Sequence, residues 1–354
     1  MNDVQKLIGK YKQIRGINFL KETYKAKYGL VGIGNHTINN LLPIIQYLQL
    51  PLKWIGCTSE DKAALIEEKY HVKGTSSIKD IMEDDEVKGL FVSATPQTHF
   101  KLAKEVIKSG KALFIEKPPC NTIEELRELK EMERACGSNI VVVGLQKRYS
   151  PMTKLLKKQL KSKKLISYNL RYLTGLYPEG EAVMDLFIHP LDYVCHLFGK
   201  ADIVSIKHIK SAKKGGETLL LVLQHQNIVG TLELSTCYTW HSSKEMIEVN
   251  TDDSVVALEQ MESLTVAKKQ SSIMGIPLEK VMPKQMNSYL HFERNNFTPI
   301  VANNQLYQQG YMGEIEAFAN MVEGKKNGEN LSQFEQIEAT YELITEIRKN
   351  INQK

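Results

Sequence analysis

The feature that most constrains the fold is a regular alternation of short apolar runs and helical patterns between Tyr28 and Val143. The apolar runs predict strands, and the segments between them predict helices that connect one strand to the next. This alternation is typical of a parallel, doubly wound α/β sheet, because parallel strands need crossover connections. The predicted strands are Tyr28–Ile33, Leu52–Cys57, Gly89–Ser93, Ala112–Ile115 and Ile140–Val143, and the predicted helices are His36–Leu48, Asp61–Tyr70, Ser76–Met82, Thr98–Ser109 and Thr122–Cys136.

After Tyr149 the pattern changes to longer β-rich runs joined by short polar turns, which predicts consecutive antiparallel strands. One helix, Asp185–Leu197, interrupts these runs, and the tail is predicted to form two helices, Met312–Glu323 and Gln333–Asn350. The predicted strands are Leu165–Leu173, Ile203–Ile209, Thr218–Gln226, Ile228–Cys237, Met246–Asn250, Val255–Gln260 and Leu264–Lys268.

The chain of 354 residues is long enough for two domains, or for one large domain with an elaborated half. We expect a dinucleotide-binding domain at 28–148 and a substrate and oligomerisation domain at 149–354, preceded by an extension at 1–27. No apolar run approaches the roughly 18 residues that span a bilayer. The five cysteines are scattered and never spaced C-x-x-C, which supports neither a disulfide framework nor a zinc site. A cytoplasmic location is the expectation.

The extension holds seven basic and two acidic residues, a net charge of +5 that equals the charge of the whole chain. Its apolar residues fall at helical spacing, which predicts an amphipathic basic helix that packs on its own or a neighbouring subunit. A membrane-surface or partner-binding arm is the alternative. Because the other residues are balanced, with 39 basic and 39 acidic, we expect no nucleic-acid partner and no membrane partner.

The segment Gly32-Ile-Gly-Asn-His-Thr37 follows the first predicted strand and opens a helix. Gly32 permits a tight turn, and Gly34 lets the backbone approach a pyrophosphate at the helix N-terminus near Asn35. Thr37 stands where a third glycine is usual, and His36 lies directly before it. We expect the phosphates of a dinucleotide cofactor to bind here.

The second predicted strand ends without the acidic residue that usually binds the adenosine ribose. Thr58 and Ser59 occupy this exit, with Lys62 nearby, and they leave room for a 2′-phosphate. The sequence therefore favours NADP(H) modestly over NAD(H).

Four further segments occur in an order that resembles the Gfo/Idh/MocA oxidoreductase family, which includes glucose-fructose oxidoreductase and inositol dehydrogenase. Together they cover roughly Tyr28 to Gly199. The segments are Ala94-Thr-Pro-Gln-Thr-His99, Glu116-Lys-Pro118, Gly144-Leu-Gln-Lys-Arg-Tyr-Ser-Pro151 and Asp185-x3-His189-x2-Asp192.

This resemblance implies a Rossmann domain followed by an α+β domain with an open, mostly antiparallel sheet. The sheet is expected to frame the active site and to mediate a homo-oligomer, a dimer or a tetramer. The helices at 312–350 are expected to pack back on the Rossmann domain. The resemblance also implies that Lys117, Asp185 and His189 are the catalytic set.

The chemistry of these residues agrees with that set. The Lys117 ammonium can stabilise a developing alkoxide, and the imidazole of His189 can take the hydroxyl proton near neutral pH. Asp185, one helical turn before His189, is expected to fix its tautomer or to bind another sugar hydroxyl.

The remaining candidate residues are expected to bind the cofactor or the substrate. Thr95, Pro96 and His99 open a helix where N–H groups face a cofactor, and Glu116 is expected beside the nicotinamide ribose. Asp185, His189, Asp192 and His196 form a stripe too long to hold one metal ion, so no metal is expected. The candidate substrate residues are Arg148, Asp192, Tyr177, Trp240 and His241.

The sequence thus predicts a nicotinamide-dependent dehydrogenase that acts on a secondary alcohol of a sugar, an inositol or a sugar derivative. One alternative is an NAD-dependent glycosidase that oxidises its substrate transiently. Another is a non-catalytic NAD(P)-sensing protein, which would have no need of Lys117, Asp185 and His189.

Overall fold

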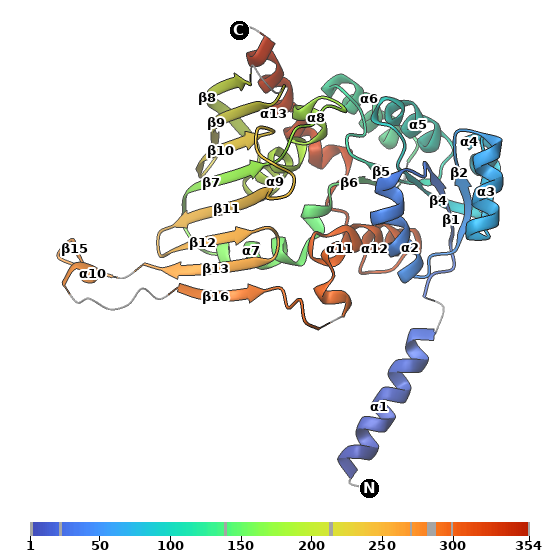
Figure 1. The fold of residues 1–354 in the computed structure, drawn as a ribbon, viewed down its shortest axis with the longest axis horizontal. Helices are drawn as coiled ribbons and strands as arrows, with labels where there is room; N and C mark the ends of the chain where they lie inside the picture. Colours follow the sequence, from blue (N-terminus) through green and yellow to red (C-terminus); the bar gives the residue numbers. More distant parts are fainter. Residues whose placement is uncertain are drawn as a thin grey trace.

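A computed structural model describes residues 3–20, 23–137, 140–211, 215–269, 271–281, 288–298 and 300–352. Two sheets and their helices form the body of the protein, and helix α1 (Asp3–Leu20) projects away from it (Figure 1). The apolar side chains of α1 from Val4 to Ile14 are exposed in the single chain. Packing of this helix on a neighbouring subunit therefore stays a prediction. None of the described helices has the length and apolar content needed to cross a membrane.

The first sheet contains six parallel strands in the order β3-β2-β1-β4-β5-β6, which confirms the predicted doubly wound fold. The short strand β3 was not predicted, because only three residues pair there. The strands are β1 (Lys27–Val31), β2 (Leu52–Gly56), β3 (Lys73–Thr75), β4 (Val87–Val92), β5 (Ala112–Glu116) and β6 (Val141–Gly144).

The helices between these strands begin at residues with the expected capping chemistry. Ser59 and Thr122 accept hydrogen bonds from Lys62 N and Glu125 N, and Pro96 occupies a first-turn position where no N–H is needed. The helical elements are η1 (Thr37–Leu41, a π-helical turn), α2 (Leu42–Tyr47), α3 (Glu60–Tyr70), α4 (Ile78–Glu83), α5 (Pro96–Lys108) and α6 (Ile123–Ala135).

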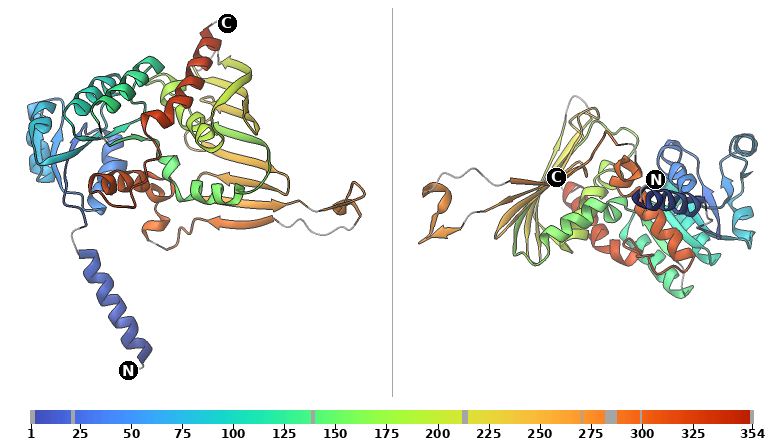
Figure 2. Two further views of the ribbon diagram at one scale, coloured as in Figure 1. Left: turned by 180° about the vertical axis from the view of Figure 1, so that it is seen from behind. Right: turned by 90° about the horizontal axis from the view of Figure 1, so that it is seen from below.

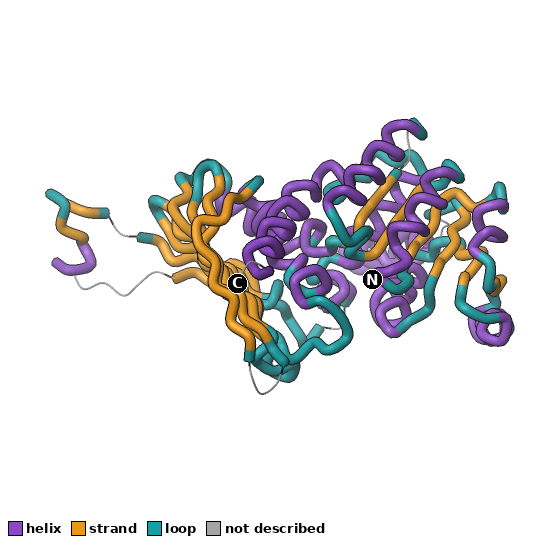
Figure 3. The backbone as a smooth tube through the Cα atoms, turned by 90° about the horizontal axis from the view of Figure 1, so that it is seen from above, coloured by secondary structure: helices purple, strands orange, loops and turns teal. Residues whose placement is uncertain are grey.

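Among the described residues, the second sheet has eight strands in the order β16-β13-β12-β11-β7-β10-β9-β8, and β7 and β10 form the one parallel pair. The helices of the body cover one face of this sheet, and apart from the projecting segment with α10 no described helix lies on the side of the other face (Figures 2 and 3). The predicted open, mostly antiparallel architecture is confirmed. The strands are β7 (Leu165–Leu173), β8 (Ala201–Lys210), β9 (Glu217–His225), β10 (Val229–Ser235), β11 (Lys244–Thr251), β12 (Ser254–Glu259), β13 (Ser263–Lys268) and β16 (Ser288–Glu293).

Shorter elements complete this half of the chain, and the hairpin of β14 and β15 with α10 projects between β13 and β16 (Figure 1). They are η2 (Gln146–Tyr149), α7 (Pro151–Leu160), α8 (Ala182–Asp185), α9 (Ile188–Phe198), β14 (Ser272–Ile273), β15 (Ile276–Pro277), α10 (Leu278–Val281), η3 (Val301–Asn303), α11 (Gln305–Gln308), α12 (Tyr311–Val322) and α13 (Phe334–Asn352).

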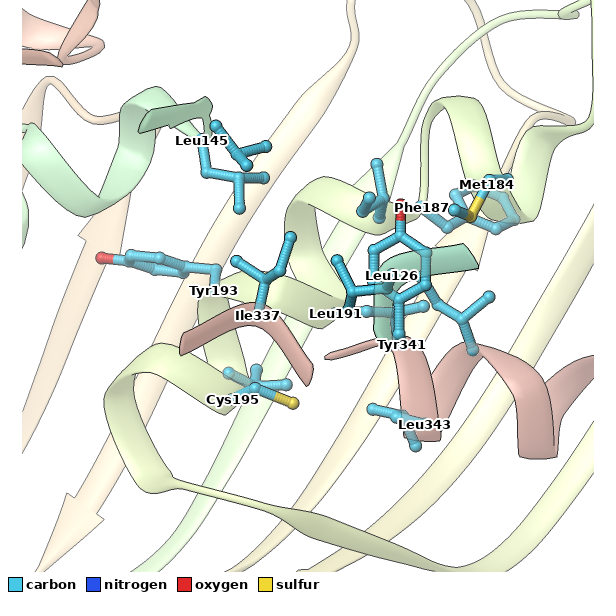
Figure 4. Close-up of a cluster of buried hydrophobic side chains, with 14 of the residues drawn as sticks. Leu126, Leu145, Met184, Phe187, Leu191, Tyr193, Cys195, Ile337, Tyr341 and Leu343 are labelled. Carbon is cyan, nitrogen blue, oxygen red and sulfur yellow. The ribbon is translucent and has the colours of Figure 1, made fainter. Parts of the chain in front are cut away.

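The C-terminal helices join the two halves. Phe318 of α12 packs into an aromatic cluster with Tyr28, Phe91 and Phe114 on one face of the parallel sheet, with neighbouring ring centroids 5.1–6.2 Å apart. Helix α13 packs on α6 and α9, where buried side chains of all three helices meet (Figure 4). Burial of this apolar surface fixes the strand exits of the parallel sheet against the second sheet.

Candidate active site

The turn after β1 has the geometry that a dinucleotide needs. Gly32 has a φ of +95°, and a Cβ there would lie 2.3 Å from the Ser93 carbonyl oxygen. A Cβ on Gly34 would meet no atom within 4 Å, so this backbone faces open space. The Thr37 hydroxyl lies 3.0 Å from both Gly32 O and Ser93 Oγ. Thr37 therefore ties the helix to the exit of β4 where a third glycine would otherwise allow close packing.

A cavity of about 800 Å³ extends from this turn along the carboxyl ends of β1, β2, β4 and β5. Its volume lies within the roughly 300–1,000 Å³ typical of ligand pockets, and its place is where open α/β sheets bind ligands. We call it the cofactor pocket. The predicted site residues that line it are Gly32, Gly34, Asn35, His36, Thr37, Thr58, Thr95, Pro96, His99, Glu116 and Lys117.

The end of the cofactor pocket at β2 is not acidic. Cys57, Thr58 and Lys62 line it, and Lys62 Nζ donates a hydrogen bond to Thr58 Oγ1 at 3.1 Å. Ser59 caps α3 and does not line the pocket in the structure. The one carboxylate among the described lining residues is Glu116, at the opposite end. The chemistry of this lining fits a dinucleotide cofactor.

Lys117 directly follows β5, and the Lys117–Pro118 peptide bond is cis. Its Nζ donates a 2.6 Å hydrogen bond to the backbone carbonyl oxygen of Asp185. Burial lowers the pKa of Lys117, and the neighbouring Glu116 and Asp185 oppose that shift. The ammonium is thus fixed between the exit of β5 and the end of α8.

The predicted single helix Asp185–Leu197 is wrong in one respect, because the chain forms two helices that break at Leu186 and Phe187. Pro190 explains the break, since it has no N–H to bond Leu186 O and its ring would clash with that carbonyl in a continuous helix. Asp185 ends α8 and His189 lies in the first turn of α9. The proposed one-face pairing of Asp185 with His189 therefore loses its helical basis.

His189 lies among cations. Burial lowers the pKa of His189 well below its usual range, and Lys117, Lys147 and His36 lower it further. The imidazole is therefore neutral at neutral pH and can accept a proton. Burial raises the pKa of Asp185, and Lys117 opposes that rise.

Lys147 was not predicted as a site residue, although it lies in the segment Gly144–Pro151 that the sequence singles out. It is buried in η2, forms an ion pair with Glu245 of β11, and its Nζ lies 5.0 Å from the centre of the Tyr172 ring. The pair joins the parallel-sheet half to the second sheet beside Lys117 and His189. No spacing in the sequence relates residue 147 to residue 245.

The other predicted cofactor residues are held by local hydrogen bonds. Thr95 is the N-cap residue of α5 and Pro96 is its first residue. The His99 ring is buried, with Nδ1 2.8 Å from Pro118 O and Nε2 3.0 Å from Ala94 O. His99 thus links the exits of β4 and β5.

The predicted substrate residues Arg148 and Asp192 form a buried ion pair and line neither of the pockets described in this section. Arg148 Nε and Nη2 donate to Asp192 at 2.9 and 2.6 Å, and the other donors reach Leu331 O and Gln336 O. All of these contacts are internal, so the geometry assigns the pair to packing.

Tyr177 lies beside Asp185. Burial is the main cause that raises the pKa of Tyr177, and the charge of Asp185 raises it further. Trp240 lines a second cavity of about 330 Å³, which we call the second pocket. His241 is exposed next to Trp240. The lining residues of the second pocket are Asn40, Tyr172, Thr174, Trp240, Ser243, Lys244, Glu245, Gln260, Gln305, Leu306, Gln309 and Tyr311.

The described residues contain no group of three or more His, Cys, Asp or Glu side chains that could hold a metal ion. Asp192 is engaged by Arg148, and His196 Nε2 lies 2.7 Å from Lys157 Nζ. These members of the predicted stripe therefore have other partners.

Comparison with known proteins agrees with this geometry. Residues 26–145 match the Gfo/Idh/MocA profile, described as an oxidoreductase family with an NAD-binding Rossmann fold. Residues 26–145 therefore resemble the NAD-binding domain of this oxidoreductase family. The chain is 26% identical to inositol 2-dehydrogenase of Acidothermus cellulolyticus over 185 residues. These residues cover 48% of this chain and 54% of that protein. The chain spans between 23% and 56% of the length of the inositol 2-dehydrogenases that it matches.

Solved structures match over nearly the whole chain. An oxidoreductase from Agrobacterium radiobacter, in complex with NAD⁺, L-tartaric acid and magnesium, has a TM-score of 0.72 at 14% identity and covers 90% of this chain and 94% of its own. A 3-ketoreductase from Actinomadura kijaniata, in complex with NADP and TDP-benzene, has a TM-score of 0.71 at 14% identity and covers 91% and 97%. At these identities the likeness shows the fold alone.

Proposed function

We propose that this protein is a dehydrogenase that moves hydride between a nicotinamide cofactor and a secondary alcohol of a sugar, an inositol or a related polyol. The observation that carries the proposal is that Lys117 lines the β5 end of the cofactor pocket and lies close enough to His189 for its charge to lower the pKa of that imidazole. The cofactor supplies hydride chemistry when bound. Lys117 holds the substrate oxygen and stabilises its developing charge, and neutral His189 takes the proton from that oxygen.

The second pocket is the proposed place for the rest of the substrate. Asn40 lies in this pocket and contacts His36 of the cofactor pocket, with Asn40 Nδ2 2.9 Å from His36 Nδ1. Its lining is rich in amide and hydroxyl groups and includes the rings of Tyr172, Trp240 and Tyr311. Amides pair with hydroxyl groups, and aromatic faces pack on apolar C–H faces. Such a lining suits a polyhydroxylated molecule.

The test of this function is a screen of inositols, sugars and sugar derivatives with both NADP⁺ and NAD⁺, followed by nicotinamide absorbance. With a substrate in hand, Lys117→Met and His189→Ala should each lower kcat by about 10²–10⁴, the usual contribution of such groups. Cofactor affinity should change little, because neither residue belongs to the phosphate-binding turn. Lys79→Met, at an exposed lysine of α4, is the matched control.

Full activity in either variant would remove that residue from the mechanism, and no turnover with any substrate of the screen would favour a cofactor-sensing protein. Net reduction of the cofactor with each substrate molecule distinguishes a dehydrogenase from a glycosidase that returns the hydride. The pH profile adds a further check. Because the pKa of His189 is well below its usual range, activity should persist below about pH 6.5, the ordinary histidine value.

NADP(H) is the proposed preference, because Thr58 and Lys62 line the β2 end of the pocket without a carboxylate. Cys57→Asp should weaken NADPH binding by about tenfold or more and leave NADH binding less affected, through repulsion of the 2′-phosphate. Cys57→Asn, which adds a similar volume without charge, is the control. Tighter binding of NADH than of NADPH by the unmodified protein would contradict this preference.

A further inference from the structure

Glu116 and His36 form an ion pair at the end of the cofactor pocket where Lys117 lies. Glu116 Oε1 is 2.9 Å from His36 Nε2, and Asn40 Nδ2 is 2.9 Å from His36 Nδ1. The Glu116 side chain is 8% exposed and the His36 side chain 38% exposed, so the carboxylate is enclosed and the imidazole reaches solvent. A Cβ on Gly144 would lie 3.0 Å from Glu116 Oε2, which shows how closely the backbone surrounds this carboxylate.

Several elements present titratable groups to this pair. Lys117 follows Glu116 on the chain, His189 of α9 lies close enough to feel the charge of His36, and the Tyr311 ring of α12 is 5.9 Å from the His36 ring. Glu314 of α12 is fully buried near Glu116, and burial raises the pKa of Glu314 well above its usual value. Burial thus favours the uncharged form of Glu314 and of His189.

The charge that changes near neutral pH is that of His36. Burial lowers the pKa of His36, but the charge of Glu116 and its hydrogen bond raise it by more, so that the net pKa lies above 6.5. With His36 protonated, the pair has no net charge. With His36 neutral, the pair carries the single negative charge of Glu116.

We propose that the protonation state of His36 decides how strongly the pocket prefers the oxidised over the reduced nicotinamide cofactor. The inference rests on the proposed function. It places the nicotinamide ring at the end of the cofactor pocket that Glu116 and Lys117 line. The oxidised ring is a cation and the reduced ring is neutral. A pair with a net negative charge attracts the cationic ring, and a neutral pair does not. The effect of His36 on the phosphates is the same for both forms and cancels in their ratio.

The experiment measures dissociation constants of NADP⁺ and NADPH by calorimetry, without substrate, from about pH 5.5 to about pH 8.5, on both sides of the ordinary histidine pKa. The ratio of the NADP⁺ constant to the NADPH constant should fall by about tenfold as the pH rises through the pKa of His36. Tenfold corresponds to a difference of about one unit between the pKa values of His36 in the two complexes. Histidine NMR titrations of the two complexes measure that difference directly, with the lower value expected in the NADP⁺ complex.

His36→Gln keeps a hydrogen-bond donor toward Glu116 but cannot become charged. Its ratio should stay at the high-pH value of the unmodified protein throughout, while His291→Gln, at an exposed histidine of β16, should follow the unmodified protein. If both cofactors bind and the ratio does not change with pH, or if His36 has the same pKa in both complexes, the inference is overturned. If neither cofactor binds, the proposed function fails instead.

Discussion

Two ion pairs of this protein involve residues that the sequence singles out, yet they differ in almost every physical respect. Arg148 and Asp192 are 2% and 3% exposed, and both oxygens of Asp192 accept hydrogen bonds from Arg148. Thr340 Oγ1 also donates to Asp192 at 3.0 Å. In the pair of Glu116 and His36, by contrast, the imidazole is 38% exposed and lines a cavity.

The difference shows how a structural ion pair is distinguished from one that can act on a ligand. A buried pair whose hydrogen-bonding groups all have protein partners has nothing left to offer a substrate. A pair at the wall of a pocket keeps a face toward the ligand and can change charge without loss of the fold. Motif membership alone does not separate the two cases.

The largest expected effect on stability follows from breaking the buried ion pair of Arg148 and Asp192. Arg148→Met should lower the free energy of unfolding by about 3–5 kcal/mol, because Asp192 would be left buried without its partner. Arg148→Met combined with Asp192→Leu should recover much of that loss. Urea denaturation measures both, and Arg171→Met, at the half-exposed pair with Glu233, should stay within about 1 kcal/mol of the unmodified protein. A loss below about 1 kcal/mol in Arg148→Met would show that Arg148 and Asp192 do not form a buried ion pair in solution.

The pair of Lys147 and Glu245 lies between these two extremes, with side chains 7% and 18% exposed. Lys147→Met should therefore cost less than Arg148→Met, about 2 kcal/mol, and should also affect the site. Since Lys147 is one of the cations that lower the pKa of His189, its removal should raise that pKa and move the acidic limb of the pH–rate profile to higher pH. Lys147→Arg keeps the charge and should restore the limb. An unmoved limb in Lys147→Met would reduce Lys147 to a packing role.

Much of this architecture could be predicted from local sequence. The alternation between Tyr28 and Val143 predicts the parallel sheet because each buried strand and each crossover helix has its own periodicity. Gly32 and Gly34 locate the cofactor turn, and the placement of Lys117 at a strand exit follows from the same alternation. These features depend on residues that are close along the chain.

Features that depend on distant residues could not be predicted. Glu245 meets Lys147 across 98 positions, and Leu331 and Gln336 complete the partners of Arg148 from more than 180 positions away. The break before His189 had a local signal in Pro190, which the spacing of Asp185 and His189 concealed. Helical spacing predicts a shared face only where the backbone can stay helical throughout.

The smallest expected effect, for each unit of pH, concerns Glu314, a buried acid with no described hydrogen-bond partner for either carboxyl oxygen. Burial raises its pKa in the folded protein well above the usual 4.5, and the negative charge of Glu116 raises it further. Between these two values the folded state binds more protons than the unfolded state, so stability is full below 4.5 and falls as the pH rises toward the folded pKa.

Glu314→Gln stays neutral at every pH, so its free energy of unfolding relative to the unmodified protein isolates this one titration. The difference should grow in favour of the variant by about 1.4 kcal/mol for each pH unit within that window. Urea denaturation at a series of pH values measures it, and Glu131→Gln, at an exposed glutamate of α6, is the control. A flat difference for Glu314→Gln as well would mean that Glu314 ionises normally. Glu314 would then place a second negative charge near Glu116. The comparison of the Glu116–His36 pair with the buried Arg148–Asp192 pair would have to include that charge.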